Sequence, residues 1–321
     1  MKSNPFNDYA ASINAAIEEY TLNKQECFFK PISYILSLKA KRVRSSLFLF
    51  SCDLFNLEKK ALIYGALAIE FFHNFTLIHD DIMDSAPLRR GKKTLHKKWS
   101  TNTAILAGDT LMVEAYIMLN KLSKKRGFCN AFNLFNSTAI FVCKGQQMDL
   151  NFEDEKDIAL ENYLKMIEYK TAVLLGCSLK MAGCFSSNIK DLELLYQVGI
   201  NMGLAFQLQD DLLDIYSDKS GKKIGGDILL NKKTLPYFLA RKTANTQQKE
   251  ELMSIYSSRN HTHKVAKTLA LFNLLDVKEK GEQLVGLYFK KAFGCLEKVT
   301  APKNKKFFLI EYLDFLASRS Y

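Results

Sequence analysis

The sequence predicts an all-α protein, and three observations support that prediction. None of its five prolines lies between Leu88 and Leu235, so nothing in that span forbids long helices. Apolar residues recur at helical spacing, as at Leu160, Leu164 and Ile167. Strict alternation of apolar and polar residues is rare, and neither an Asn-Gly nor an Asp-Gly hairpin turn occurs. We therefore expect a bundle of long helices around a central cavity.

The composition is that of an ordinary globular protein without a membrane span. Of the 321 residues, 48% are hydrophobic and 25% are charged. This length allows one or two domains, and because no repeat at solenoid period occurs we expect a single domain over residues 1–321. Met1–Asn23 lacks the basic-then-apolar order of a signal peptide. The most apolar stretch, Ala61–Phe72, contains Glu70 and is too short to cross a bilayer, so we expect a cytoplasmic protein.

The cysteines and the net charge narrow the classes of function. Seven cysteines without a Cys-x-x-Cys pair are typical of reduced thiols rather than of disulfides or a zinc site. A net charge of +11 allows either nucleic acid or a small polyanionic substrate as the partner. The basic residues form short, separate clusters without interleaved aromatic residues, so diphosphate substrates are favoured over nucleic acid.

One acidic pattern, Asp-Asp-x-x-Asp, occurs twice in the chain. The first copy follows Ala61–Ile78, which is apolar nearly all round and is therefore predicted to be a helix buried in the bundle. The second copy lies towards the end of a similar predicted helix, Met202–Ile215, and Gln207 lies on the same face of that helix as the acids. The six acids are Asp80, Asp81, Asp84, Asp210, Asp211 and Asp214.

Carboxylates clustered in this way predict a magnesium site. On a helix, acids at positions i, i+1 and i+4 place two or three carboxylates on one side, where they repel one another unless a cation is shared. Magnesium bound between such acids and substrate phosphates removes that repulsion. Two buried helices with their acidic ends facing each other would form one metal-lined cleft.

Two breaks between the predicted helices are rich in glycine and in basic residues. Ser85–Lys98 contains Pro87, Gly91, Arg89, Arg90, Lys92 and Lys93. Ser217–Thr234 contains Gly221, Gly225, Gly226, Lys219, Lys222, Lys223, Lys232 and Lys233. Since each break follows an acidic helix end, both are expected to act as mobile lids over bound phosphates; a plain solvated loop is the alternative.

The motifs and their surroundings strongly resemble the trans-isoprenyl diphosphate synthase (polyprenyl synthetase) family. The first copy continues, four residues later, into Arg89-Arg90-Gly91, and the second is preceded by Gln207-Leu208-Gln209. Glu168–Ala172 is similar to the family's Lys-Thr element, and Lys232–Pro236 follows the second break as in the family. The resemblance covers approximately residues 39–236. It implies an all-α isoprenoid synthase fold, a homodimer and a prenyltransferase.

The resemblance also implies a reaction and roles for individual residues. Family members condense isopentenyl diphosphate with an allylic diphosphate, head to tail. Three Mg²⁺ ions would be bound by the six aspartates. Contacts to the allylic diphosphate would come from Arg89, Lys170, Lys222 and Lys232, with Thr171 and Gln207 nearby. Contacts to isopentenyl diphosphate would come from Lys41, Arg44, His73 and Arg90. The catalytic set would comprise Asp80, Asp81, Asp84, Lys170, Asp210 and Lys222.

The chain departs from the family at the isopentenyl diphosphate site. The usual pattern is Gly-Gly-Lys-x-x-Arg-Pro, and here Lys39, Ala40 and Ser45 replace both glycines and the proline. The Lys and Arg of the pattern remain, so the charges for the diphosphate are present, while the shape of the loop is left open. Arg42 is expected to be a solvated charge rather than a ligand.

Two histidines and one group of three residues keep two interpretations each. His73 is a core histidine or a ligand, and its place seven residues before Asp80 favours a ligand. His79 either orients the acids or is merely packed. Asp149, with Gln146 and Gln147, either lines the cleft or lies outside it.

The length of the product depends on the helix before Asp80. Phe75 lies five residues earlier, about 7.5 Å along a helix axis, where its ring would form a floor for the growing tail. Thr76 is smaller and lies directly below Asp80. An aromatic residue at this place resembles the short-chain synthases of the family. We therefore expect geranylgeranyl diphosphate as the product, with farnesyl diphosphate as the alternative and a longer product less favoured.

Three other functions compete with this one. A terpene cyclase shares the fold and the first motif, but the second motif with Lys41 and Arg44 argues against it. A non-catalytic subunit of a hetero-oligomeric synthase would be expected to have lost aspartates or arginines, and none is missing. A basic nucleic-acid binder would explain the net charge but not the acids.

Overall fold

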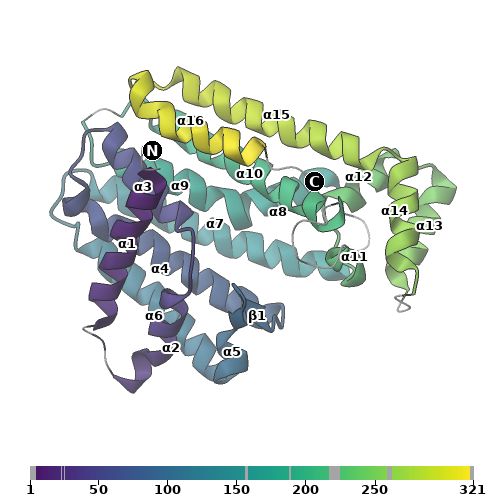
Figure 1. Cartoon of the computed structure of the whole chain (residues 1–321), viewed down its shortest axis with the longest axis horizontal. Helices are drawn as coiled ribbons and strands as arrows, with labels where there is room; N and C mark the ends of the chain where they lie inside the picture. The colour runs from purple at the N-terminus through teal and green to yellow at the C-terminus, as the bar shows by residue number, and fades with distance from the viewer. Residues whose placement is uncertain are drawn as a thin grey trace. The chain divides into compact units, whose positions relative to one another are not determined.

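The computed structural model describes residues 5–22, 24, 26–155, 158–187, 189–216, 225–258 and 262–318 (Figure 1). The N-terminal helices are α1 (Pro5–Leu22), α2 (Lys30–Ser37), α3 (Val43–Leu54) and α4 (Lys59–Met83), with a 3-10 turn at Cys27–Phe29. The middle of the chain forms the strands β1 (Leu88–Arg89) and β2 (Lys92–Lys93), then α5 (Leu95–Lys98), α6 (Thr101–Asn120), α7 (Phe128–Asp154), α8 (Leu160–Ile167), a π-helical turn (Glu168–Ala172), α9 (Val173–Gly183) and α10 (Leu192–Tyr216). The C-terminal helices are α11 (Gly226–Leu229), α12 (Leu235–Thr243), α13 (Thr246–Ser257), α14 (Lys264–Leu274), α15 (Val277–Lys298) and α16 (Lys303–Ala317).

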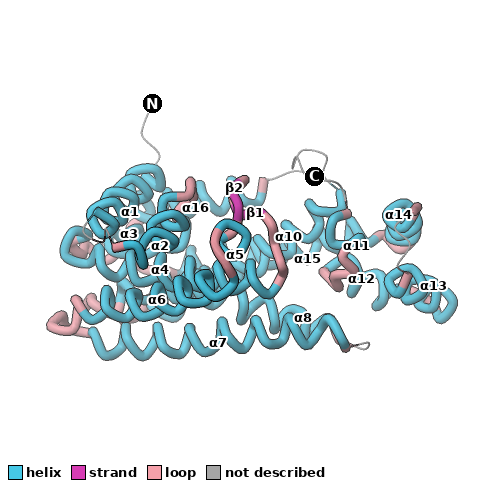
Figure 2. Tube along the Cα trace, turned by 90° about the horizontal axis from the view of Figure 1, so that it is seen from below, coloured by secondary structure: helices cyan, strands magenta, loops and turns pink. Residues whose placement is uncertain are grey.

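The prediction of an all-α fold is confirmed. Within the described residues, the only strands are the two short ones of a single hairpin (Figure 2). The chain divides into two compact units. Unit one lies within residues 1–137, 177–196 and 299–308, and unit two within residues 138–176, 197–298 and 309–321. The single domain over residues 1–321 stays a prediction.

Helix α4 forms the centre of unit one. It packs against α6, α3 and α1, and buries Phe71 and Phe72 almost completely. Because α4 and α6 approach closely, a Cβ added at Gly108 of α6 would lie 2.4 Å from His79 Nε2. The helix ends at Met83, so Asp80 and Asp81 belong to its last turn and Asp84 is its C-cap, which places the acids at the end of this helix as the sequence predicted.

The full length of α4 also revises the expectation about membrane spans. The predicted apolar stretch was too short to cross a bilayer, but the 25-residue helix is long and apolar enough by length and composition. In its most apolar window, 67% is buried inside the protein, as in the core helix of a globular fold. Helix α4 is the one helix of this length and apolar composition among the described residues, and one such helix is weak evidence for a membrane span.

Unit two is built around α12 and carries the second acidic motif on α10. Residues 235–240 of α12 are all buried, and the helix packs against α15, α8 and α14. The π-helical turn Glu168–Ala172 lies directly against α7, because a Cβ at Gly145 would be only 2.2 Å from the backbone nitrogen of Lys170. A single π turn of this kind is frequently found at functional sites.

The expected breaks contain more regular structure than the sequence indicated. In Ser85–Lys98, β1 and β2 pair with Leu88 opposite Lys93, so Arg90 and Gly91 alone form the turn. Their φ angles are 53° and 74°, and positive φ at both central residues is what a type I′ turn requires. In the second break, Gly226–Leu229 forms α11, whereas Lys219, Gly221, Lys222 and Lys223 lie outside the described residues.

Candidate active site

The first acidic motif ends α4 in unit one with one buried and one exposed carboxylate. Asp81 is 2% exposed, and burial raises the pKa of its carboxyl group. Asp80 is partly exposed, and Asp84, at the C-cap, is exposed. The C-terminal end of a helix carries partial negative charge, so carboxylates gathered there need a cation.

Arg89 of β1 provides part of the positive charge that these carboxylates need. Its Nε donates to Asp81 Oδ1 at 2.8 Å, one terminal nitrogen donates to the same oxygen at 2.5 Å, and the pair is completed by a 3.5 Å contact to Asp80. The hairpin is thereby fastened to the end of α4. The structure therefore brings Arg89 together with the first motif, whereas the contact of Arg89 to an allylic diphosphate stays a prediction.

His79 packs against the neighbouring helix instead of orienting the acids. Its Nε2 lies 3.3 Å from the carbonyl oxygen of Ile105 and 3.6 Å from Asp109 Oδ1, both on α6. Its ring meets that of Phe75 edge-on, with the centroids 4.8 Å apart. Of the two interpretations, the structure favours packing.

The residues predicted for isopentenyl diphosphate gather where α3 begins beside α4. One terminal nitrogen of Arg44 lies 3.3 Å from His73 Nε2. Burial, followed by the neighbouring cations Arg44 and Arg90, lowers the pKa of His73 well below its usual range. A neutral His73 can accept a hydrogen bond from Arg44, and Lys41 is exposed just before α3.

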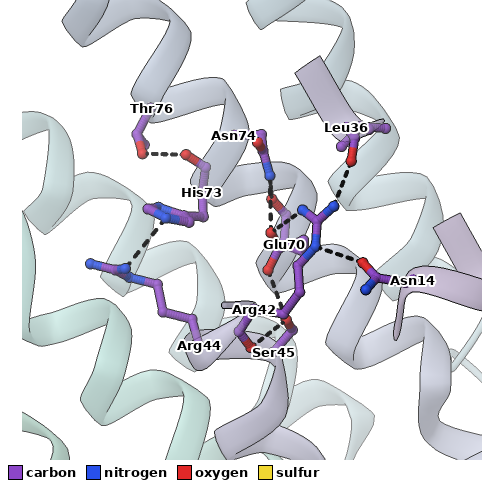
Figure 3. A network of polar contacts seen from close by, with 9 residues as sticks. All are labelled: Asn14, Leu36, Arg42, Arg44, Ser45, Glu70, His73, Asn74 and Thr76. Carbon is purple, nitrogen blue, oxygen red and sulfur yellow. Dashed lines mark hydrogen bonds and ion pairs between the residues drawn. The ribbon is translucent and has the colours of Figure 1, made fainter. Parts of the chain in front are cut away.

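Arg42 corrects an expectation, because it is not a solvated charge. It is 5% exposed, and one terminal nitrogen lies 2.7 Å from Glu70 Oε1 in a buried ion pair (Figure 3). The signal that would have found it is Glu70 itself. A carboxylate in the middle of an otherwise apolar helix requires a buried partner, and the basic run before α3 was the place to seek one.

The loss of the family's glycines causes no strain at the positions where they are replaced. Neither Lys39 nor Ala40 has a positive φ, and the left-handed residue of this loop is Arg42, with φ 49° and ψ 34°. Ser45 occupies the first turn of α3, where a proline would also be tolerated. Helix α3 therefore still begins next to Lys41 and Arg44, the Lys and Arg of the family pattern.

The second acidic motif, in unit two, also combines a buried acid with acids that are partly exposed. Asp211 is 4% exposed and accepts hydrogen bonds from the Tyr163 hydroxyl, from Gln207 Nε2 at 3.2 Å and from the backbone nitrogen of Leu235 at 3.2 Å. Burial outweighs these donors and raises the pKa of Asp211 to about 7. Asp210 is partly exposed. Tyr163 was not predicted, and nothing near it in the sequence signals the contact.

Asp214 fastens the segment that follows the second motif. One of its carboxylate oxygens accepts from the backbone nitrogen of Asp227 at 2.9 Å, and its carbonyl oxygen accepts from the nitrogen of Gly225 at 2.8 Å. The backbone nitrogen of Lys232 in turn donates to the carbonyl of Asp227. The predicted Lys222 lies outside the described residues.

The Lys-Thr element lies on the π-helical turn beside the second motif. Lys170 Nζ is 2.6 Å from Asp149 Oδ2, and Thr171 Oγ1 is 3.4 Å from Gln207 Oε1. Asp149 is thus brought to the predicted site residues. Gln147 instead bonds Asn151 at 2.8 Å on the exposed side of α7.

The donor chemistry suits a hard divalent cation that is completed by substrate oxygens. Within the described part of the chain, no three His, Cys, Asp or Glu side chains are arranged to hold a metal ion by themselves. Mg²⁺ is usually bound through one or two carboxylates together with waters and phosphate oxygens. Each motif offers such carboxylates next to a buried one, Asp81 or Asp211, whose pKa is raised mainly by burial.

Comparison with known proteins decides the family. Residues 25–273 match the polyprenyl synthetase family. A geranylgeranyl diphosphate synthase of Saccharolobus solfataricus is 34% identical over 260 residues, which cover 79% of this chain and 78% of that protein. The chain belongs to the polyprenyl synthetase family. It is therefore a prenyltransferase, as the sequence predicted.

Other relatives of this polyprenyl synthetase agree on the fold and differ in product. A crystal structure of a geranylgeranyl pyrophosphate synthase superimposes with a TM-score of 0.92 at 34% identity, covering 98% of this chain and 99% of that one. A geranylfarnesyl diphosphate synthase of Natronomonas pharaonis is 36% identical over 250 residues, covering 71% of this chain and 73% of that protein. Family membership thus leaves the product length to be argued from this chain's own residues.

Proposed function

We propose that this polyprenyl synthetase is a Mg²⁺-dependent short-chain synthase that condenses isopentenyl diphosphate with allylic diphosphates to make geranylgeranyl diphosphate. The observation that carries the proposal is the division within each acidic motif. One aspartate of each pair, Asp81 or Asp211, is buried and held by protein donors, while Asp80 and Asp210 are partly exposed. Such an arrangement fixes the helix end and presents the remaining carboxylates to a shared cation.

The reaction requires separation of charge in a dry site. The bond between C1 of the allylic substrate and its diphosphate oxygen breaks, and the double bond of isopentenyl diphosphate then joins its C4 to that C1. A proton leaves C2 of the new cation, and the released pyrophosphate can accept it. Bound Mg²⁺ would neutralise the charge that develops on the leaving diphosphate. An apolar wall, which α4 around Phe71–Ile78 would supply, would exclude water from the cation.

The acids that are at least partly exposed, Asp80 and Asp84 in the first motif and Asp210 and Asp214 in the second, are the best candidates for direct metal ligands. Asp81 and Asp211 would act mainly by orienting these neighbours. Arg89, Lys170 and Lys232, with Lys222, would bind the allylic diphosphate, and Thr171 and Gln207 would support them. Arg89 pairs with Asp81, and Lys170 pairs with Asp149. A bound diphosphate would therefore compete with these carboxylates for the two basic side chains.

Isopentenyl diphosphate would bind to Lys41, Arg44, His73 and Arg90. Arginine forks match phosphate oxygens in geometry, and a lysine adds a point charge. Because His73 is kept neutral, it can hold Arg44 in place without adding to the repulsion among the cations.

Phe75 would limit the product to twenty carbons. Its ring is 8% exposed and is supported by His79 and by Phe72, whose centroid lies 5.4 Å away. Substitution of Phe75 by alanine should shift the main product towards twenty-five carbons or more, which chromatography of the dephosphorylated alcohols would measure. Phe50→Leu, in the core of α3, controls for general loosening. An unchanged product from Phe75→Ala would remove Phe75 as the floor.

A second copy of the chain is the proposed partner. Helix α6 exposes Leu106, Val113 and Ile117 at 56%, 54% and 46%, and their spacing places them along one face. An exposed apolar face on a helix is commonly an interface. We propose a homodimer that covers this face and works in the cytoplasm.

The experiment that tests the function is a product assay. Purified protein is incubated with Mg²⁺, labelled isopentenyl diphosphate and, separately, five-, ten- and fifteen-carbon allylic diphosphates. A twenty-carbon alcohol after dephosphorylation supports both the activity and the length limit, whereas a fifteen-carbon alcohol supports the activity alone. Folded protein that forms no product from any starter, with or without Mg²⁺, contradicts the proposal.

A further inference from the structure

A buried ion pair lies directly behind the proposed isopentenyl diphosphate site. Arg42, at the start of α3, and Glu70, in the middle of α4, are 5% and 1% exposed. The guanidinium of Arg42 uses all three nitrogens: one donates to Glu70 Oε1 at 2.7 Å, one to the carbonyl oxygen of Leu36 at 2.5 Å, and Nε to Asn14 Oδ1 at 3.0 Å (Figure 3). This single side chain therefore connects α1, α2 and α4.

The carboxylate of Glu70 is equally well satisfied. Its Oε1 also accepts from Asn74 Nδ2 at 3.2 Å, and its Oε2 accepts from Ser45 Oγ at 2.7 Å. Asn74 is fixed in turn by a 2.8 Å bond to the carbonyl of Glu70. A buried ion pair adds little net stability over well-packed apolar residues, since desolvation offsets the attraction. Its position relative to the site therefore matters more than its strength.

The network flanks both members of the Arg44–His73 pair. Arg42 and Ser45 stand on either side of Arg44 in the sequence, and Glu70 and Asn74 stand on either side of His73. Figure 3 shows the two pairs side by side, with Arg44 and His73 on one side of the network. Any displacement of α3 relative to α4 would thus move the guanidinium of Arg44 away from the His73 ring.

The backbone of Arg42 depends on the same contacts. Its left-handed conformation is unfavourable for a residue with a Cβ, and α3 begins immediately after it without a side-chain cap. Ser45 Oγ donates its one proton to Glu70 Oε2 at 2.7 Å and lies 3.1 Å from the carbonyl oxygen of Arg42, so the hydroxyl group lies between this turn and Glu70. The turn sets the direction in which α3 starts and, with it, the positions of Lys41 and Arg44.

We propose that Arg42, Ser45, Glu70 and Asn74 form a positioning network for isopentenyl diphosphate. The proposal rests on the proposed function, in which Arg44 and His73 bind that substrate. Ser45 gives the network a feature of its own, because a proline at this place, as in the usual family pattern, has no hydroxyl to donate to Glu70. Glu70 also neutralises Arg42, so Lys41, Arg44 and Arg90 remain the cations directed at the diphosphate.

The most specific test is Ser45→Ala, which removes one hydroxyl and keeps the ion pair. Loss of a hydrogen bond to a buried carboxylate should loosen the start of α3, and we expect KM for isopentenyl diphosphate to rise about fivefold. KM for the allylic diphosphate and kcat should change less than twofold. Ser45→Pro restores the family residue without the hydroxyl, so it should behave like Ser45→Ala.

Thr300→Val is the matched control. The Thr300 hydroxyl donates at 2.6 Å to Asp191, another buried carboxylate of unit one, so its loss should lower stability in a similar way. We expect no change in either KM for this variant. The double variant Arg42→Met with Glu70→Met removes the pair without leaving a lone buried charge. It should raise KM for isopentenyl diphosphate by tenfold or more while the protein stays folded by circular dichroism.

The outcomes separate failure of this inference from failure of the proposed function. Calorimetric titration of the wild type with isopentenyl diphosphate alone should show binding, and absence of both binding and turnover would overturn the proposed function. If the wild type is active and Ser45→Ala leaves KM unchanged, the network is not a positioning device. If both substrates are weakened equally, or Thr300→Val has the same effect as Ser45→Ala, the network is structural only.

Discussion

At the scale of single residues, burial assigns different work to adjacent aspartates. Asp211 accepts three protein hydrogen bonds in the core of unit two, whereas Asp210 is partly exposed. A buried acceptor is expensive to alter because its donors lose their partner, while an accessible carboxylate can be altered at little structural expense.

This difference predicts opposite consequences for two isosteric substitutions. Asp211→Asn should lower the free energy of unfolding by about 1–3 kcal/mol, since an amide offers only one acceptor oxygen to these donors. Asp210→Asn should lower stability less than Asp211→Asn, because Asp210 is partly exposed, but should raise the Mg²⁺ concentration for half-maximal activity about tenfold or more. Urea titration and Mg²⁺-dependent assays measure the two effects. Equal destabilisation by both substitutions would contradict the division of roles.

The residues that the sequence could not place are those whose partners are distant in the chain. The acids could be named because their spacing is local, and Arg89, Lys170 and Thr171 because the motifs that contain them resemble those of the family. Arg42 was mistaken for a solvated charge because a basic run looks alike whether or not a carboxylate from another helix meets it. The Tyr163 contact to Asp211 likewise depends on tertiary packing alone.

At the scale of elements, two irregular backbone segments position basic residues of the proposed site. The hairpin was not predicted because its turn uses Arg90 and Gly91 in place of Asn-Gly, with the same positive φ angles. The π-helical turn was not predicted either, since no sequence pattern marks the insertion of one residue into a helix. Both irregular elements carry residues of the proposed site, Arg89 and Arg90 in one and Lys170 and Thr171 in the other.

The π-helical turn predicts a role for the glycine beside it. A Cβ at Gly145 would lie 2.2 Å from the nitrogen and 2.7 Å from the Cα of Lys170, so Gly145→Ala must push this turn away from α7. We expect a loss of about 1–3 kcal/mol in stability and a rise in KM for the allylic diphosphate. Gly286→Ala in α15, with no atom within 4 Å of the new Cβ, should instead stabilise the protein by about 0.5–1 kcal/mol. Equal effects from the two substitutions would refute the close-approach argument.

At the scale of the whole molecule, the fold class and family could be predicted because they depend on many residues at once. Helical periodicity, scarce prolines and two acidic motifs in order agree on one architecture, so an error at any single position does little harm. Helix ends and the division into compact units depend on few residues, and there the sequence was less informative.

Assembly is the last property that belongs to the whole molecule. The exposed apolar residues of α6 should be covered in a homodimer, so a charge at their centre would have to be buried without a partner. Val113→Lys should therefore convert the dimer to a monomer, or weaken it at least a hundredfold, in sedimentation equilibrium. Ser123→Lys, exposed in the loop after α6, adds the same charge outside this face and should leave the dimer intact. A wild type that sediments as a monomer would exclude the homodimer, and a Val113→Lys variant that remains a dimer would place its interface elsewhere.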